Sequence, residues 1–180
     1  MKLCFVTNDK NYSKLFRWLF NEDSSHVGTT FNINGVELAT DLNRPYGTLW
    51  DLNYWKSKYN IVWSMELKLS DQEEFEIFKA CREYAVLRKY DMAGYYYGMV
   101  WGILAKFFGL TLPKVNIWAE DTGSMCQEII VPLVQHPIFK KYVPTSIPVV
   151  RTTAKTPGMV RKMMMDATKD NEHITWVYNG

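Results

Sequence analysis

The sequence predicts an α+β fold in a single domain spanning residues 1–180. Alternating apolar residues and helical spacings follow each other in the order β, α, β-hairpin, β, α, α, α and a mixed tail. The chain has 180 residues, of which 47% are hydrophobic and 15% aromatic. This composition is sufficient for one well-filled core, and no repeat, low-complexity tract or linker divides the chain.

The first third of the chain predicts a strand, a helix and a hairpin. Residues 2–7 alternate and are rich in β-branched or aromatic side chains, which favours a strand. Residues 12–21 place Leu15, Trp18 and Leu19 at helical spacing, with Phe16 and Phe20 on a neighbouring face. Residues 26–33 and 36–41 then flank Asn34-Gly35, a strong signal for a two-residue hairpin turn.

The middle of the chain predicts a further strand followed at once by a helix. Residues 61–69 place their apolar side chains on one face of a strand. The sequence SDQE beginning at Ser70 forms a capping box with Glu73, so the helix begins at residue 70 or 71. Its buried stripe is expected to contain Phe75, Phe78, Cys81 and Ala85. Cys81 is then a small core residue, and Cys4, inside an apolar strand, is interpreted in the same way.

Residues 92–109 form the one stretch that is long enough to cross a bilayer. Lys106 lies inside the stretch, and three tyrosines and four glycines dilute its apolar character. We therefore expect a buried helix here and no transmembrane segment.

The last part of the chain predicts two helices separated by extended pieces. Thr122, Gly123 and Ser124 are turn and N-cap residues ahead of a helix over residues 122–135, which Pro132 should kink or end. Extended, proline-punctuated pieces come next, at 143–150. Thr156 as N-cap and Pro157 as first helical residue then begin a short helix.

Charge and cysteine usage exclude several function classes. The net charge is only +2, and the basic segment between His136 and Asp170 has the character of a solvated face, so no nucleic-acid partner is expected. The three cysteines are widely spaced, which disfavours disulfides and structural zinc. No signal-peptide core follows Met1, so we expect a cytoplasmic protein.

Two side chains stand out as candidates for chemistry, although each also has a structural explanation. Cys126 falls in the first turn of its predicted helix, where the helix dipole favours a thiolate; alternatively, it simply packs. His26 opens an alternating strand beside Gly28, which leaves room for a substrate; alternatively, it is an ordinary strand residue. His136 precedes a proline and His173 lies in the polar tail, so neither is favoured.

The order of these motifs resembles the circularly permuted papain-like cysteine peptidases and amidases of the NlpC-type superfamily. The resemblance is carried by SHVG around His26, by Tyr90-Asp91 ahead of an aromatic helix, and by Cys-x-Glu-Ile-Ile from Cys126, and it spans residues 2–135. It implies Cys126 as nucleophile and His26 as general base. A C-terminal extension would follow this core.

The resemblance also implies a third polar residue on the strand after His26. Glu37 is the natural candidate, because a carboxylate can orient the imidazole, but another hairpin register would substitute Thr40 or Asp41. An ordinary exposed carboxylate is an equal alternative for Glu37. Gln127 stands where the family often has serine, which leaves the substrate contacts near the thiol open.

The implied reaction is acyl transfer through Cys126, with no metal or organic cofactor required. The expected activity is a cysteine hydrolase cleaving a peptide or isopeptide amide bond. A thiol acyltransferase or lipid esterase is the nearest alternative, with residues 92–109 lining an apolar cleft. A non-catalytic binding protein using the basic face around Arg161 and Lys162 is another. The substrate is thus a peptide, an isopeptide or an acylated compound, and the sequence does not indicate an oligomeric state.

Overall fold

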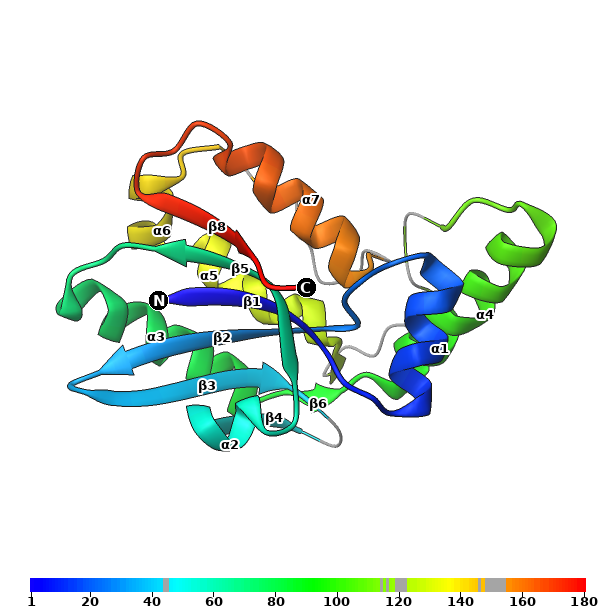
Figure 1. The fold of residues 1–180 in the computed structure, drawn as a ribbon, viewed down its shortest axis with the longest axis horizontal. Helices are drawn as coiled ribbons and strands as arrows, with labels where there is room; N and C mark the ends of the chain where they lie inside the picture. Colours follow the sequence, from blue (N-terminus) through cyan, green and yellow to red (C-terminus); the bar gives the residue numbers. More distant parts are fainter. Residues whose placement is uncertain (44–45, 114, 116, 119–122, 146, 148–154) are drawn as a thin grey trace.

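The computed structural model shows an antiparallel six-stranded sheet with helices packed against it (Figure 1). The structure describes residues 1–43, 46–113, 115, 117–118, 123–145, 147 and 155–180. The strands lie in the order β4-β3-β2-β1-β5-β8, and each neighbouring pair is antiparallel. Their bounds are β1 Lys2–Thr7, β2 His26–Ile33, β3 Val36–Leu42, β4 Gly47–Asp51, β5 Asn60–Leu67 and β8 Ile174–Tyr178.

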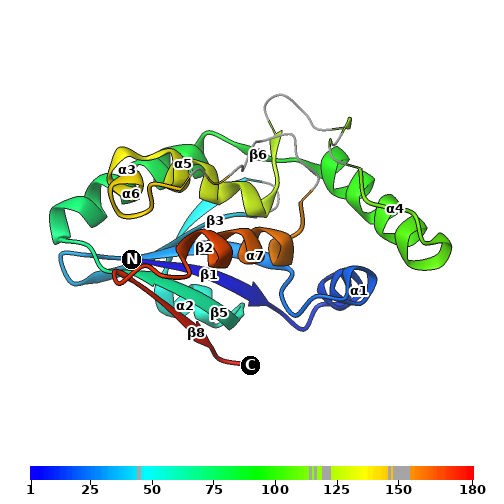
Figure 2. The ribbon, with the colours of Figure 1, turned by 90° about the horizontal axis from the view of Figure 1, so that it is seen from above.

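Helices cover both faces of the sheet, and two further helices form a separate pair beside it. The elements are α1 Asn11–Phe20, α2 Leu52–Lys56, α3 Asp71–Val86, α4 Met92–Phe108, the 3₁₀ helix η1 Cys126–Ile129, α5 Ile130–Gln135, α6 Pro137–Tyr142 and α7 Pro157–Thr168. The larger core lies between the sheet and α3, α5, α6 and α7, and a smaller one lies under α2 on the opposite face (Figure 2). Two short strands, β6 Lys89–Tyr90 and β7 Gly123–Ser124, pair in parallel apart from the main sheet.

The sequence-based α+β prediction and its antiparallel sheet are confirmed. The strands expected at 2–7, 26–33, 36–41 and 61–69 all belong to the one sheet, although β5 ends at Leu67. The capping box forms, since the Ser70 side chain accepts from the Glu73 amide and Glu73 reaches back to Ser70. Elements that were not predicted include β4, α2 and β8.

Cysteines 4 and 81 are core residues, as expected. Both are fully buried, Cys4 under α2 and Cys81 between α3 and the sheet. Burial raises the pKa of each thiol to about 12. Phe75, however, is more than one-third exposed and lies outside the buried stripe of α3.

The prediction that residues 92–109 form a buried helix is wrong. Helix α4 lies beside α1, away from the sheet, and much of its surface is exposed (Figures 1 and 2). Its contact with α1 is close: a Cβ at Gly102 would come within 2.7 Å of the Phe20 ring. The composition of α4 did not reveal this, because a helix apolar on every side selects no face, and the sheet is already covered by other helices. Among the described residues, no helix has both the length and the apolarity to cross a bilayer.

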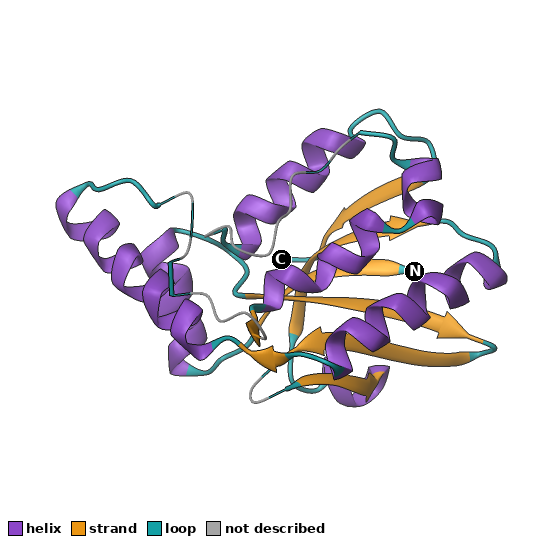
Figure 3. Cartoon of the chain, turned by 180° about the vertical axis from the view of Figure 1, so that it is seen from behind, coloured by secondary structure: helices purple, strands orange, loops and turns teal. Residues whose placement is uncertain are grey.

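Seen from behind, helices lie over the strands of the sheet (Figure 3), and the C-terminal part of the chain adds α7 to this helical layer and β8 to one edge of the sheet. The Thr156 side chain caps α7 by accepting from the Met159 amide, and Pro157 is the first helical residue, as predicted. Of the extended pieces expected at 143–150, residues 146 and 148–150 lie outside the described residues, and 143–145 and 147 belong to no strand. Strand β8 pairs with β5, so residues after 135 contribute directly to the sheet.

Candidate active site

His26 is held at the end of the central part of the sheet. It is the first residue of β2 and lies opposite Val6 of β1. The residue is only 8% exposed. Its ring nitrogens therefore need partners that the fold brings to this end of the sheet.

The hairpin turn determines which residue of β3 meets His26. Asn34 and Gly35 both have positive φ, as a two-residue turn matched to the strand twist requires. The turn pairs Ile33 with Val36, and counting back along both strands pairs Gly28 with Asp41. Because residues two apart in a strand share a face, Asp41 lies diagonally beside His26.

Asp41 is a fully buried carboxylate that accepts three side-chain hydrogen bonds. His26 Nε2 and Trp55 Nε1 each lie 3.0 Å from Oδ2, and Trp50 Nε1 lies 3.0 Å from Oδ1. The two indoles come from the end of β4 and from α2, neither of which was predicted. Three donors satisfy the carboxylate and fix its orientation toward the imidazole.

Glu37 does not reach His26, which corrects the expectation for the third residue. It pairs with Asn32 near the turn and is exposed. Glu37 shares the sheet face of Asp41 but stands four residues away along β3, or about 13 Å at the rise of an extended strand. Thr40 points to the opposite face, where its hydroxyl bonds Thr29 at 2.6 Å. Asp41, the alternative named from the sequence, is the residue at the imidazole.

Aromatic rings enclose the imidazole and its carboxylate partner. The Tyr59 ring stacks on His26 with centroids 5.0 Å apart and 13° between planes. Gly28 leaves space for Trp55, since a Cβ there would lie 2.6 Å from Trp55 Cζ2. The space that the sequence suggested for a substrate beside His26 is therefore filled by a tryptophan that orients Asp41.

Cys126 begins a short 3₁₀ helix, η1, and not the longer α-helix expected over residues 122–135. Met125 is the residue before η1 and supplies no side-chain cap. Of the expected cap residues, Thr122 lies outside the described residues, and Gly123 and Ser124 belong to β7. Pro132 lies in the first turn of α5, where its ring is incompatible with a regular α-helix running back through residue 128. Pro132 thus prevents one continuous α-helix, and residues 126–129 ahead of α5 form the 3₁₀ helix η1 instead.

The structure brings Cys126 and His26 together. The Cys126 thiol is buried, and its sulfur is close enough to the imidazole to influence the His26 pKa. Burial opposes a charge on His26, but the negative charge of the Cys126 thiolate and the hydrogen bond to Asp41 outweigh it and raise the His26 pKa to about 10. This arrangement favours a protonated His26 between Cys126 and Asp41.

Gln127 contributes a second polar group beside the sulfur. Cys126 Sγ lies 3.6 Å from Gln127 Oε1, which can accept a hydrogen bond when the thiol is protonated. The Gln127 side chain is buried, and its Nε2 finds no hydrogen-bond partner among the described residues. A buried amide donor without a partner is costly, so it is a natural place for an acceptor supplied by a substrate.

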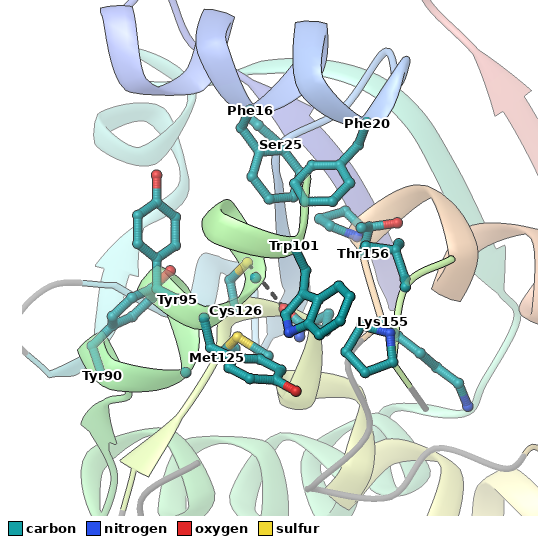
Figure 4. A pocket seen from close by; sticks show the side chains of 17 residues that line it. Phe16, Phe20, Ser25, Tyr90, Tyr95, Trp101, Met125, Cys126, Lys155 and Thr156 are labelled. Atoms are coloured by element: carbon teal, nitrogen blue, oxygen red, sulfur yellow. Dashed lines mark hydrogen bonds between the residues drawn. The ribbon is translucent and has the colours of Figure 1, made fainter. Parts of the chain in front are cut away.

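Cys126 lies in the wall of a largely aromatic pocket (Figure 4). Phe16 and Phe20 come from α1, Trp101 from α4, and Thr156 from the start of α7. Gln127 also lines this pocket, and Ser25, Phe16, Tyr90 and Tyr95 line both it and a second pocket at His26. The thiol and the imidazole are therefore accessible from adjoining cavities between the sheet end and the α1–α4 pair.

Comparisons with known proteins assign no family to the chain. No family model matches it, and no curated protein matches it. One solved structure, titled as that of the metalloprotein yiiX from Escherichia coli O157:H7, superposes with a TM-score of 0.49 at 16% identity, covering 99% of this chain and 96% of that chain. At this identity and score the likeness assigns neither an activity nor a family.

The assignment to the circularly permuted papain-like peptidases is therefore wrong as a family assignment. It relied on SHVG, four residues, and on a loose pattern after Cys126, and no family model supports it. Within the residues that the structure describes, no group of three or more His, Cys, Asp or Glu could hold a metal ion. The chemistry of the site is accordingly inferred from the geometry of Cys126, His26 and Asp41 and not from a relative.

Proposed function

We propose that this protein is a cysteine hydrolase that cleaves an amide bond through Cys126, His26 and Asp41. One observation supports the proposal above all others: a buried carboxylate bonds a buried imidazole, whose pKa is in turn influenced by a cysteine in the wall of a pocket. A nucleophile, a base and a group that orients the base are the three parts that acyl transfer requires.

The reaction begins with the thiolate and imidazolium that the high His26 pKa favours. The Cys126 sulfur attacks the carbonyl carbon, and a C–S bond forms while the carbonyl oxygen takes the negative charge. The C–N bond then breaks as His26 gives its proton to the departing nitrogen, leaving a thioester. His26 next takes a proton from water, the hydroxide attacks the thioester, and the thiolate leaves as the carboxylic acid is released.

Two donors serve the oxyanion in this reaction. The backbone amide of Cys126 opens η1, where the first amides lack partners within the helix. The Gln127 Nε2 is the second donor, because it is buried beside the sulfur and lacks a partner among the described residues. Asp41 keeps the imidazole in the orientation that serves both proton transfers.

A second candidate is hydrolysis or transfer of an apolar acyl group, as by a lipid esterase or thiol acyltransferase. The pocket at Cys126 favours it, since Phe16, Phe20 and Trp101 offer apolar surface to an acyl chain. The alternative of a non-catalytic protein binding through a basic face has less support. Arg161 is occupied by Asp23, 2.6 Å away, and by the Trp63 ring.

The first test is the pH dependence of alkylation by iodoacetamide, with each cysteine followed by peptide mass spectrometry. A thiolate held by His26 predicts that Cys126 reacts well below pH 7. Cys4 and Cys81 are internal controls, because burial raises their pKa to about 12. Slow reaction of Cys126 only above pH 8, unaffected by His26→Ala, would contradict the site.

The second test distinguishes the two substrate classes. Wild-type protein is mixed with p-nitrophenyl esters of short and long fatty acids and with peptide p-nitroanilides, and acyl-enzyme is sought by intact mass. A burst with an acyl adduct on Cys126, absent in Cys126→Ser, supports acyl transfer. Preference for the anilides supports amide hydrolysis, whereas rates that rise with chain length support the acyl-group candidate. Absence of any adduct on Cys126 with all of these probes counts against both.

A further inference from the structure

Helices α1 and α4 carry apolar side chains that the fold leaves uncovered. The exposed set contains large apolar side chains of both helices and is here named the α1–α4 ridge: Tyr12, Leu15, Trp18, Val100, Ile103 and Phe107. Trp18 and Phe107 are 52% and 64% exposed, and their ring centroids lie 6.0 Å apart. The two exposed stripes therefore meet in one surface.

The spacing shows that this exposure belongs to an ordered face of each helix. Tyr12, Leu15 and Trp18 recur every third residue, and Val100, Ile103 and Phe107 recur at three and four residues. The opposite faces are occupied: Phe20 packs on Gly102, and Phe16 and Trp101 line the pocket at Cys126. The helix pair projects from the body of the protein, so the ridge is open to a large partner (Figures 1 and 2).

The charges on these two helices are of one sign. Lys14 and Arg17 on α1 and Lys106 on α4 are their basic residues, and neither helix contains Asp or Glu. Lys106 Nζ lies 5.1 Å from the centre of the Trp18 ring and donates to the Trp18 carbonyl oxygen. Aromatic and aliphatic groups beside cations match a partner surface that has an apolar interior under an anionic outer layer.

We propose that the α1–α4 ridge docks on the surface of a lipid bilayer that contains anionic lipid. Trp18, Phe107 and their neighbours enter the boundary between headgroups and acyl chains, and Lys14 and Lys106 contact the phosphates. The same two helices line the pocket at Cys126 with their opposite faces, so the helix pair stands between this pocket and the bilayer. The proposal concerns a surface, and it holds whether or not Cys126 is a nucleophile.

The test is co-sedimentation with vesicles of phosphatidylcholine alone and of phosphatidylcholine mixed with phosphatidylglycerol. Wild-type protein is expected to sediment with the mixed vesicles, and salt should weaken binding. The double variant Trp18→Ser/Phe107→Ser should bind at least roughly tenfold more weakly, because each of these large side chains loses its burial. The matched control is Val86→Ser/Leu87→Ser, an exposed apolar pair at the end of α3, which should bind as wild type does.

Two further measurements separate docking from misfolding and from catalysis. Hydrogen–deuterium exchange of the wild-type protein should slow on vesicle addition in 92–108 and 11–20, and this requires no variant. Cys126→Ser should still bind, which separates a failure of docking from a failure of the proposed reaction. No binding to either vesicle, or equal loss in both double variants, would overturn the proposal. Concentration-dependent dimers abolished by Trp18→Ser/Phe107→Ser, without vesicle binding, would assign the ridge to a second copy instead.

Discussion

Asp41 Oδ2 lies 3.0 Å from His26 Nε2, a contact between two neighbouring strands that the tight turn at Asn34-Gly35 sets in register. Asp41 is wholly buried, so the two tryptophan indoles that also bond it are structural requirements of the site and not accessories. The efficiency of the proposed reaction thus depends on residues of β4 and α2 that hold Asp41 in place.

Asp41→Asn should reduce turnover by roughly a hundredfold or more, because an amide cannot stabilise the imidazolium. Glu37→Gln is the matched control on the same face of β3 and should keep wild-type turnover. The measurement is the burst and steady-state rate on the p-nitrophenyl ester that reacts best. Equal rates for Asp41→Asn and wild type would remove Asp41 from the site.

Replacing Cys126 by serine should lower the His26 pKa from about 10 toward its ordinary value of 6.5, because the thiolate charge is the largest favourable influence on the imidazolium. The change is measured by NMR titration of the His26 ring protons. A pKa raised in the folded state means that His26 stabilises the protein fully below pH 6.5 and loses this contribution as pH rises toward 10. A His26 pKa that is the same in both proteins would contradict the thiolate–imidazolium pair.

Gly28→Ala should destabilise the protein by about 1–3 kcal/mol, since the new Cβ would lie 2.6 Å from Trp55 Cζ2 in a packed region. Displacing Trp55 should also lower turnover, because its indole bonds Asp41. Gly98→Ala is the control for stability: a Cβ there meets nothing within 4 Å, and alanine favours the helix. Thermal unfolding followed by circular dichroism compares the two, and an unchanged melting temperature for Gly28→Ala would show that Trp55 moves freely.

Gln127→Ala should lower kcat by roughly a hundredfold with little change in KM, if Nε2 serves the oxyanion. Gln127→Glu should be at least as slow, because a carboxylate beside the sulfur repels the developing charge. Alkylation of Cys126 in both variants provides the control, since it reports the thiolate without an oxyanion. A proportional rise in KM with kcat unchanged would assign Gln127 to substrate binding instead.

The sequence was most informative where local rules decide the structure. Asn34-Gly35 specified the hairpin, Ser70 with Glu73 specified a helix start, and alternation specified four strands of the sheet. The same turn also determines which residue of β3 lies beside His26 and so serves as the third residue of the candidate site. A two-residue turn fixes every pair of the hairpin by equal steps back along its strands, and this rule places Asp41 and not Glu37 beside His26.

Other features could not be inferred from local patterns. Trp50, Trp55 and Tyr59 form the surroundings of Asp41 and His26 through tertiary contacts made by β4, α2 and the loop after it. Helix α4 has apolar residues on every side. Its periodicity therefore did not indicate that it would pack against α1 and not against the sheet. The location of a helix depends on which surfaces are already covered, and that is a property of the whole fold.

The pairing of β8 with β5 has a consequence for the order of folding. Trp63 and Tyr178 are partners although more than a hundred residues separate them, whereas β2, β3 and β4 pair through short connections. Closing so long a loop costs entropy before any contact offsets it, so the hairpins should form early and the β8 edge late. Refolding followed at single residues should therefore show the β2–β3 amides protected first and those of β8 last.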